Sequence, residues 1–186
     1  AWMKRYLVVA SCVLMLVFLG TNQAWSVFVR PLRSSYGFSA FQMQLIFNTC
    51  VFVFCTMIII AGRLHDRFGP RPLAAAGAAF IGLGWALAWA FGDRYIVLWI
   101  SIGLLAATGS AVGYVCPLAT AIKWFPRRPG LVSGLAAAGF AGGPILLSAI
   151  AEVLMRHGWS ARSVFGFIGA TYAPAVLLTG MALALP

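Results

Sequence analysis

Six long apolar runs separated by short polar segments constrain the fold of this chain more than any other feature. Each run is about 20 residues long, the length with which a helix crosses a hydrocarbon core of about 30 Å. The strands of a membrane barrel would alternate in short segments, which these runs do not. The sequence therefore predicts an all-α membrane protein whose six transmembrane helices cover residues 6–29, 41–61, 73–91, 95–122, 131–154 and 162–186.

Composition indicates the same class of protein. Hydrophobic residues make up 62% of the chain and charged residues 9%, whereas roughly a quarter of the residues in a soluble domain are charged. The net charge of +10 does not indicate nucleic-acid binding, because the basic residues lie in short segments between spans. The first run is too long for a signal peptide and no small-residue cleavage site follows it, so it is predicted to be a retained span.

The basic residues also predict an orientation. Six spans place both termini on one side of the membrane. Eight cations lie on that side: Lys4, Arg5, Arg63, Arg67, Arg71, Lys123, Arg127 and Arg128. Five lie on the other side: Arg30, Arg33, Arg94, Arg156 and Arg162. Because cytoplasmic loops carry the excess of Lys and Arg, both termini are predicted to be cytoplasmic.

Polar residues interrupt the first span. Thr21, Asn22 and Gln23 make this polar interruption next to Trp25. Amides within a membrane need partners from neighbouring helices or a water-filled cavity. Structural hydrogen bonding and substrate contact both remain open for them. Arg30 and Pro31 are expected to end this helix, because proline lacks an amide proton.

Two further positions could line a cavity. In the fourth span, Tyr114 and Pro117 are expected to interrupt the helix near exposed backbone. In the second span, Gln44 and Asn48 are four residues apart and therefore share a helix face that could line a cavity. Their place in the first two turns favours the membrane interface over the midplane.

The segment from Gly62 to Arg71 forms a short basic turn between the second and third runs. Gly62 would let helix ends approach closely, and Gly69 permits a tight reversal. Asp66 could cap a helix N-terminus or pair with Arg67 or Arg71.

This segment resembles the cytoplasmic loop between helices 2 and 3 of the major facilitator superfamily, whose pattern is Gly-x-Leu-x-Asp-Arg-x-Gly-x-Arg. Every fixed position matches, at Gly62, Leu64, Asp66, Arg67, Gly69 and Arg71. The resemblance implies that the chain is the N-terminal six-helix half of a twelve-helix transporter, built as two inverted three-helix repeats. It also implies that the matched glycines, aspartate and arginines form a conformational gate that latches the two halves, rather than binding substrate.

Three other features resemble the oxalate/formate antiporter and monocarboxylate transporter group within that superfamily. They are Pro31-Leu32 after the first span, the loop Lys123-Trp124-Phe125-Pro126-Arg127-Arg128, and the glycine-rich fifth span with Gly142-Gly143-Pro144. The resemblance implies transport of a small organic anion, a mono- or dicarboxylate, by alternating access in the inner membrane of a bacterium. No Lys or Arg lies at the middle of a span, so Asn22, Gln23, Trp25 and Tyr114 could contribute only hydrogen bonds and aromatic walls to its site.

Close helix contact is predicted where small residues recur at a spacing of four. Gly109 and Gly113 form such a face in the fourth span, and Gly139 and Gly143 form another in the fifth. Glu152 and Arg156 also have this spacing, which favours an ion pair over a proton carrier.

Enzymatic and cofactor-dependent functions are disfavoured. No nucleophile has a base beside it, and no glycine-rich phosphate loop follows a strand. His65 and His157 are expected in loops on opposite sides, where they could not jointly bind a haem. The cysteines lie within apolar runs without Cys-x-x-Cys spacing and are predicted to be small buried hydrophobes: Cys12, Cys50, Cys55 and Cys116. No metal, cofactor or nucleic acid is expected.

Three hypotheses remain for the biological role. The chain could be one half of an organic-anion transporter whose second six-helix half lies elsewhere in the same chain or in a second chain. It could be a half-size transporter that works as a homodimer. It could instead be a structural membrane subunit of a larger complex that has kept the fold. The lipid bilayer is an expected partner in each case.

Overall fold

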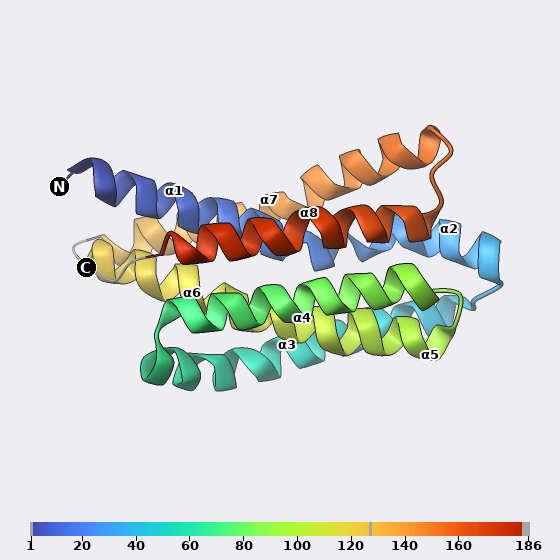
Figure 1. Cartoon of the computed structure of the whole chain (residues 1–186), viewed down its shortest axis with the longest axis horizontal. Coiled ribbons are helices and arrows are strands. Elements are labelled where there is room, and N and C mark those ends of the chain that lie inside the picture. Colours follow the sequence, from blue (N-terminus) through green and yellow to red (C-terminus); the bar gives the residue numbers. More distant parts are fainter. Residues whose placement is uncertain (1, 127, 184–186) are drawn as a thin grey trace.

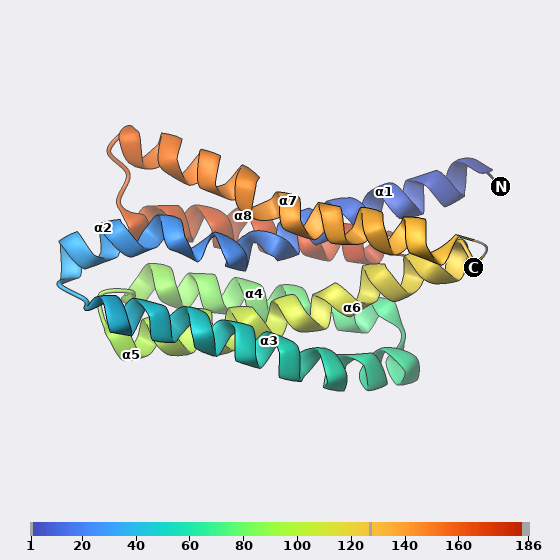
Figure 2. The ribbon, with the colours of Figure 1, turned by 180° about the vertical axis from the view of Figure 1, so that it is seen from behind.

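The computed structural model describes residues 2–126 and 128–183, with side chains described from Val8 onward except that of Asn22. Six helical spans lie side by side in an elongated bundle (Figures 1 and 2). The prediction of six membrane-length helices is confirmed. The first turn of α1 and the end of α8 lie at the same end of the bundle (Figure 1), hereafter the terminal end, and the opposite end is called the far end.

Two of the six spans contain a change of helix type. The first consists of α1 (Trp2–Leu19), the 3-10 segment η1 (Gly20–Trp25) and α2 (Ser26–Tyr36). The fourth consists of α5 (Tyr95–Leu98), the π-helical segment η2 (Trp99–Ala106) and α6 (Ala107–Trp124). The remaining spans are α3 (Ala40–Phe68), α4 (Pro70–Phe91), α7 (Pro129–Arg156) and α8 (Ala161–Met181).

The first span ends later than predicted. Arg30 and Pro31 do not end it, because α2 continues through both to Tyr36. A membrane helix tolerates proline where neighbouring groups compensate for the missing hydrogen bond. The actual stop is Gly37, which has a φ of 70° and donates its N–H to the Arg33 carbonyl. Ser39 then starts α3 through reciprocal hydrogen bonds with Gln42, a capping box.

The basic segment is mostly helical rather than a loop. Residues 62–68 form the last turns of α3, so the reversal depends on Gly69 alone. Gly69 has a φ of 80°, a conformation that favours glycine, and its N–H bonds the His65 carbonyl at 2.9 Å. Pro70 starts α4 at once, because its fixed φ suits the first helical position.

The predicted interruption at Tyr114 and Pro117 is also wrong. Both residues lie inside the continuous helix α6, and the irregular backbone precedes it, at η2. There the Trp99 indole N–H donates to the Thr49 hydroxyl of α3 at 3.0 Å. The deviation in the fourth span therefore coincides with packing against the second span rather than with the proline.

The small-residue faces make the predicted close contacts. A Cβ on Gly77 of α4 would lie 2.9 Å from the Gly109 carbonyl oxygen of α6. A Cβ on Gly139 of α7 would lie 3.1 Å from the Val13 carbonyl oxygen of α1. The backbones of these helix pairs are therefore in close contact, third span with fourth and first span with fifth.

Arginine side chains join α4 and α8, which lie side by side (Figure 1). At the far end, Arg162 of α8 donates to the carbonyls of Trp89 at 2.9 Å and Ala90 at 2.6 Å. At the terminal end, Arg71 of α4 donates its Nε–H to the Leu183 carbonyl at 3.2 Å. The contacts of Arg162 satisfy carbonyls in the last turn of α4, where helical carbonyls lack a partner within their own helix. The contact of Arg71 holds the chain just after α8.

Candidate functional site

The helix break at η1 lies near the middle of the first span and includes the predicted polar residues. Thr21 is buried and donates its hydroxyl to the Phe18 carbonyl at 2.8 Å. Gln23 is exposed and its amide makes no hydrogen bond to the described residues. The side chain of Asn22 lies outside the described residues. Among the described side chains of η1, Gln23 therefore offers hydrogen-bonding groups without a partner in the described chain.

Trp25 joins the first and second spans. Its side chain is 4% exposed, and its indole N–H donates to the Met43 carbonyl of α3 at 3.0 Å. The donor that could have bound a ligand is thus already engaged. A contact between Trp25 and substrate stays a prediction, whereas its structural contact is part of the fold.

Tyr114 belongs to an aromatic cluster formed by three helices. Its ring centroid lies 5.7 Å from that of Phe54 in α3 and 5.0 Å from that of Phe140 in α7, both in edge-on arrangements. Phe54 and Phe140 stack at 5.6 Å. All three residues lie near the middle of their spans, so the cluster forms an aromatic wall at mid-depth in the bundle.

The aromatic cluster and the helix break lie at the same depth. A Cβ on Gly20, the first residue of η1, would collide with the Phe140 carbonyl oxygen. The start of the break therefore rests directly on the turn of α7 that carries Phe140. Gln23 and Tyr114, far apart in the sequence, both lie in this region, although no direct contact joins them.

Gln44 and Asn48, the polar pair of the second span, lie on the same face of α3, as predicted. The Gln44 side-chain amide donates to the Asn48 side-chain oxygen at 3.0 Å, and both residues are exposed on α3.

Near the end of the fifth span, the predicted ion pair is confirmed, with Arg156 donating to Glu152 at 2.7 Å. Both groups of that pair are exposed, as expected for a surface pair.

In the segment from Gly62 to Arg71, which the family resemblance predicts to be a gate, the charged side chains have different partners. Asp66 has a side chain that is 82% exposed, and its carboxylate lies 3.7 Å from Nδ1 of His65. It caps no helix, since α4 has no side-chain cap, and it pairs with neither Arg67 nor Arg71. The Arg67 guanidinium lies 5.3 Å from the centre of the Phe68 ring, and Arg71 bonds the end of α8.

Gly62 does not mediate a close approach within the described chain. A Cβ placed on it would meet nothing within 4 Å. His65 is also not in a loop, because it is buried in the last turns of α3. Its Nε2 atom has no hydrogen-bond partner among the described residues.

No group of three or more His, Cys, Asp or Glu side chains that could hold a metal ion occurs among the described residues. The four cysteines are free. Cys12, Cys50 and Cys116 are buried as predicted, but Cys55 is exposed on α3. Its exposure follows from the orientation of α3, which the apolar sequence around it does not indicate.

Sequence reasoning missed Phe54 and Phe140. A phenylalanine in an apolar run looks the same whether it faces lipid or another helix, so no local signal distinguishes these two. Their distance from the helix ends was the usable signal, because it places them at the depth of Gln23 and Tyr114. The rotation of each helix, which brings the rings together, is a property of packing.

Six helices of membrane-spanning length and composition define a polytopic membrane protein. The sequence profile of the Major Facilitator Superfamily matches residues 10–186. The chain belongs to this superfamily, and its fold is half of the superfamily fold, with two inverted three-helix repeats.

Several curated relatives are similar to this chain. It is 30% identical over 132 residues to "Uncharacterized MFS-type transporter YhjX" of Escherichia coli, covering 71% of this chain and 33% of that protein. It is 29% identical over 163 residues to "Oxalate:formate antiporter" of Oxalobacter formigenes, covering 87% and 38%. It is 30% identical over 156 residues to "Monocarboxylate transporter 3" of Mus musculus, covering 83% and 32%. The chain thus spans about a third of the length of these relatives.

Proposed function

We propose that this chain forms one six-helix half of a secondary transporter that moves a small organic anion, a mono- or dicarboxylate, by alternating access. The observation that carries the proposal is the break at η1, where Gln23 stays exposed and unbonded near the middle of the first span. An amide at that depth needs water or a ligand as its partner. The relatives named for oxalate, formate and monocarboxylates support an anion as that ligand.

The proposed substrate site combines hydrogen bonds with aromatic walls. Asn22, Gln23 and Tyr114 would supply the polar contacts, and Trp25 would close the site from the side of α3. Phe54 and Phe140 would hold the Tyr114 ring in position. Since no cation lies at mid-depth in this half, the charge of the anion would be balanced by the second half.

A second six-helix half would cover α3 and α7. In the apolar 18-residue stretch of each span, 17% of the stretch is buried in α3 and 28% in α7, against 56% in the fourth span. The exposed stripe of α3 carries Gln44, Asn48 and Thr56, and polar groups of this kind are costly against lipid. These faces favour a protein partner, either a second segment or a second copy of this chain.

The gate would depend on Asp66 in particular. Its carboxylate is the exposed charge of the segment, whereas Arg67 lies on a ring and Arg71 bonds α8. Gly62 offers open space beside it, and Gly69 sets the reversal between α3 and α4. We infer that Asp66 reaches the second half in one conformation of the transport cycle and releases it in the other.

The proposed location is the bacterial inner membrane, with the terminal end of the bundle in the cytoplasm. The excess of Lys and Arg at that end supports this orientation. The far end, where α2 meets α3, would then face outward.

Exchange in proteoliposomes tests the proposal. The intact protein is reconstituted with internal formate, and uptake of radiolabelled oxalate is followed. Exchange above protein-free vesicles supports transport, and its absence for oxalate, formate and lactate alike contradicts it. Native mass spectrometry separates the alternatives, since a structural subunit would be found in an assembly of unrelated chains.

A further inference from the structure

Four of the five arginines at the far end fall into two groups, and the fifth, Arg94, is exposed just before α5. Arg156 pairs with Glu152, and Arg162 donates to the carbonyls at the end of α4. Arg30 and Arg33 of α2 make no ion pair or hydrogen bond with the described residues through their side chains. Two unneutralised positive charges are therefore left within one helical turn of each other.

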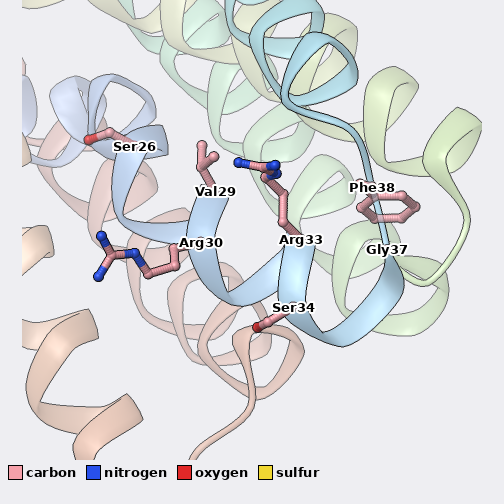
Figure 3. A pocket seen from close by; sticks show the side chains of 7 residues that line it. All are labelled: Ser26, Val29, Arg30, Arg33, Ser34, Gly37 and Phe38. Carbon is pink, nitrogen blue, oxygen red and sulfur yellow. The ribbon is translucent and has the colours of Figure 1, made fainter.

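These two arginines line an open pocket of about 700 Å³ that runs along one face of α2 and the turn that follows it. Its other lining residues are Ser26, Val29, Ser34, Gly37 and Phe38. Figure 3 shows the Arg33 guanidinium between Val29 and Phe38 and the Arg30 guanidinium on the side of Ser26. No carboxylate belongs to the lining, so the local charge of the pocket is positive.

The wall of the pocket at Phe38 is held in place by other rings. The centroid of Phe38 lies 5.7 Å from that of Tyr36 and 6.2 Å from that of Tyr95 in the fourth span. Gly37 leaves open space beside it, since a Cβ there would meet nothing within 4 Å. The ring of Phe38, packed against other rings, thus bounds the pocket on one side, and the pocket is open beside Gly37.

Guanidinium groups have the geometry and charge for binding oxygen anions, because their planar donors match a carboxylate or a phosphate. A mouth lined with one sign of charge also raises the local concentration of ions of opposite sign. We propose that this pocket is a capture site for a small oxyanion at the far mouth of the bundle. Its role in collecting transport substrate rests on the proposed function, whereas oxyanion binding itself does not.

Direct binding tests the site without transport. Oxalate is titrated calorimetrically into the intact protein in an uncharged detergent, at low salt and at about 0.5 M salt. At high salt the attraction between an exposed arginine and an anion is screened within a few ångströms. Binding of oxalate at the capture site is therefore the part of the measured binding that salt weakens. We expect Arg33→Gln and Arg30→Gln each to weaken that part about fivefold, equivalent to roughly 1 kcal/mol.

Arg94→Gln is the matched control. Arg94 is an exposed cation at the same end, outside the pocket lining, and its removal should leave oxalate affinity within about twofold. Equal salt-sensitive binding by wild type, Arg30→Gln and Arg33→Gln would overturn the proposal. So would an equal loss in Arg94→Gln, since net charge alone would then explain the effect.

Nanodiscs distinguish the source of the oxyanion. If a lipid headgroup phosphate occupies the site, phosphatidylglycerol will weaken oxalate binding to wild type but not to the two pocket variants. If a free carboxylate occupies it, discs of phosphatidylcholine with or without phosphatidylglycerol will give equal affinities. Salt-sensitive binding without oxalate exchange would count against the proposed function alone, whereas exchange with no such binding would count against the capture site alone.

Discussion

Arg71 and Arg162 occupy equivalent positions in two antiparallel helices. Each is the second residue of its helix, α4 or α8. Arg162 donates to the carbonyls of Trp89 and Ala90 in the last turn of α4, and Arg71 donates to the carbonyl of Leu183, two residues after the end of α8. The two helices close the first and second three-helix repeats, so the contacts lie at opposite ends of the seam between them.

This relationship predicts the effect of removing Arg162. Arg162→Ala should lower the free energy of unfolding by about 1–2 kcal/mol, because two charge-assisted hydrogen bonds to helix-end carbonyls are lost. Thermal unfolding in detergent measures the change. Arg156→Ala is the control, since its exposed ion pair with Glu152 is worth at most about 0.5 kcal/mol. Equal melting temperatures for both variants would contradict the contribution assigned to Arg162.

The close contact between α4 and α6 predicts a second stability effect. A Cβ on Gly109 would lie 2.7 Å from the Gly77 carbonyl oxygen, so Gly109→Ala should destabilise the bundle by about 1–3 kcal/mol. Gly134→Ala in α7 meets nothing within 4 Å and should be neutral or stabilising by up to about 1 kcal/mol. Comparable melting of the two variants would argue against a tight seam at Gly109.

Asp66→Asn should impair transport without affecting folding. The carboxylate is exposed and lies 3.7 Å from Nδ1 of His65, so its loss costs the isolated half little. If Asp66 latches the second half, we expect exchange to slow about tenfold, roughly 1.4 kcal/mol on the rate-limiting step. Glu152→Gln, which removes another exposed acid, should exchange at the wild-type rate. Normal exchange by Asp66→Asn would remove it from the gate.

Tyr114→Phe removes the hydroxyl of Tyr114 but keeps its ring, so it distinguishes the role of the hydroxyl from that of ring packing. The ring contacts with Phe54 and Phe140 persist in the variant, so stability should be unchanged. If the hydroxyl binds substrate, the KM for oxalate should rise about fivefold, equivalent to a hydrogen bond of roughly 1 kcal/mol. Tyr172→Phe in α8 is the control, because that ring packs against Phe18 inside the bundle. An unchanged KM for Tyr114→Phe would restrict Tyr114 to packing.

The number of spans, the Glu152–Arg156 pair and the glycine faces could be predicted because each depends on local spacing. Helix ends could not, since Pro31 is accommodated inside α2 and a single glycine, Gly69, makes the turn that ten residues suggested. The segments η1 and η2 also carry no local signature. Their hydrogen-bond shifts accompany contacts with residues distant in the sequence, such as Thr49 with Trp99.

The candidate site was predicted only in part, for a related reason. Gln23 and Tyr114 stand out in an apolar sequence because they are polar. Phe54 and Phe140 do not, although they contact Tyr114. Trp25 was noticed for the same polarity, yet its indole N–H bonds Met43 inside the bundle, a partner that only the arrangement of α1 and α3 reveals.

The central claim is that substrate binds beside the helix break at mid-depth, and a comparison of Gln23→Ala with Trp25→Ala in oxalate/formate exchange tests it most directly. Gln23 is exposed and unbonded, so Gln23→Ala should raise the KM for oxalate about fivefold at an unchanged melting temperature. Trp25 is 4% exposed, so Trp25→Ala should lower the melting temperature as well, with a loss of about 3–5 kcal/mol. A wild-type KM for Gln23→Ala in protein of wild-type stability would contradict the account.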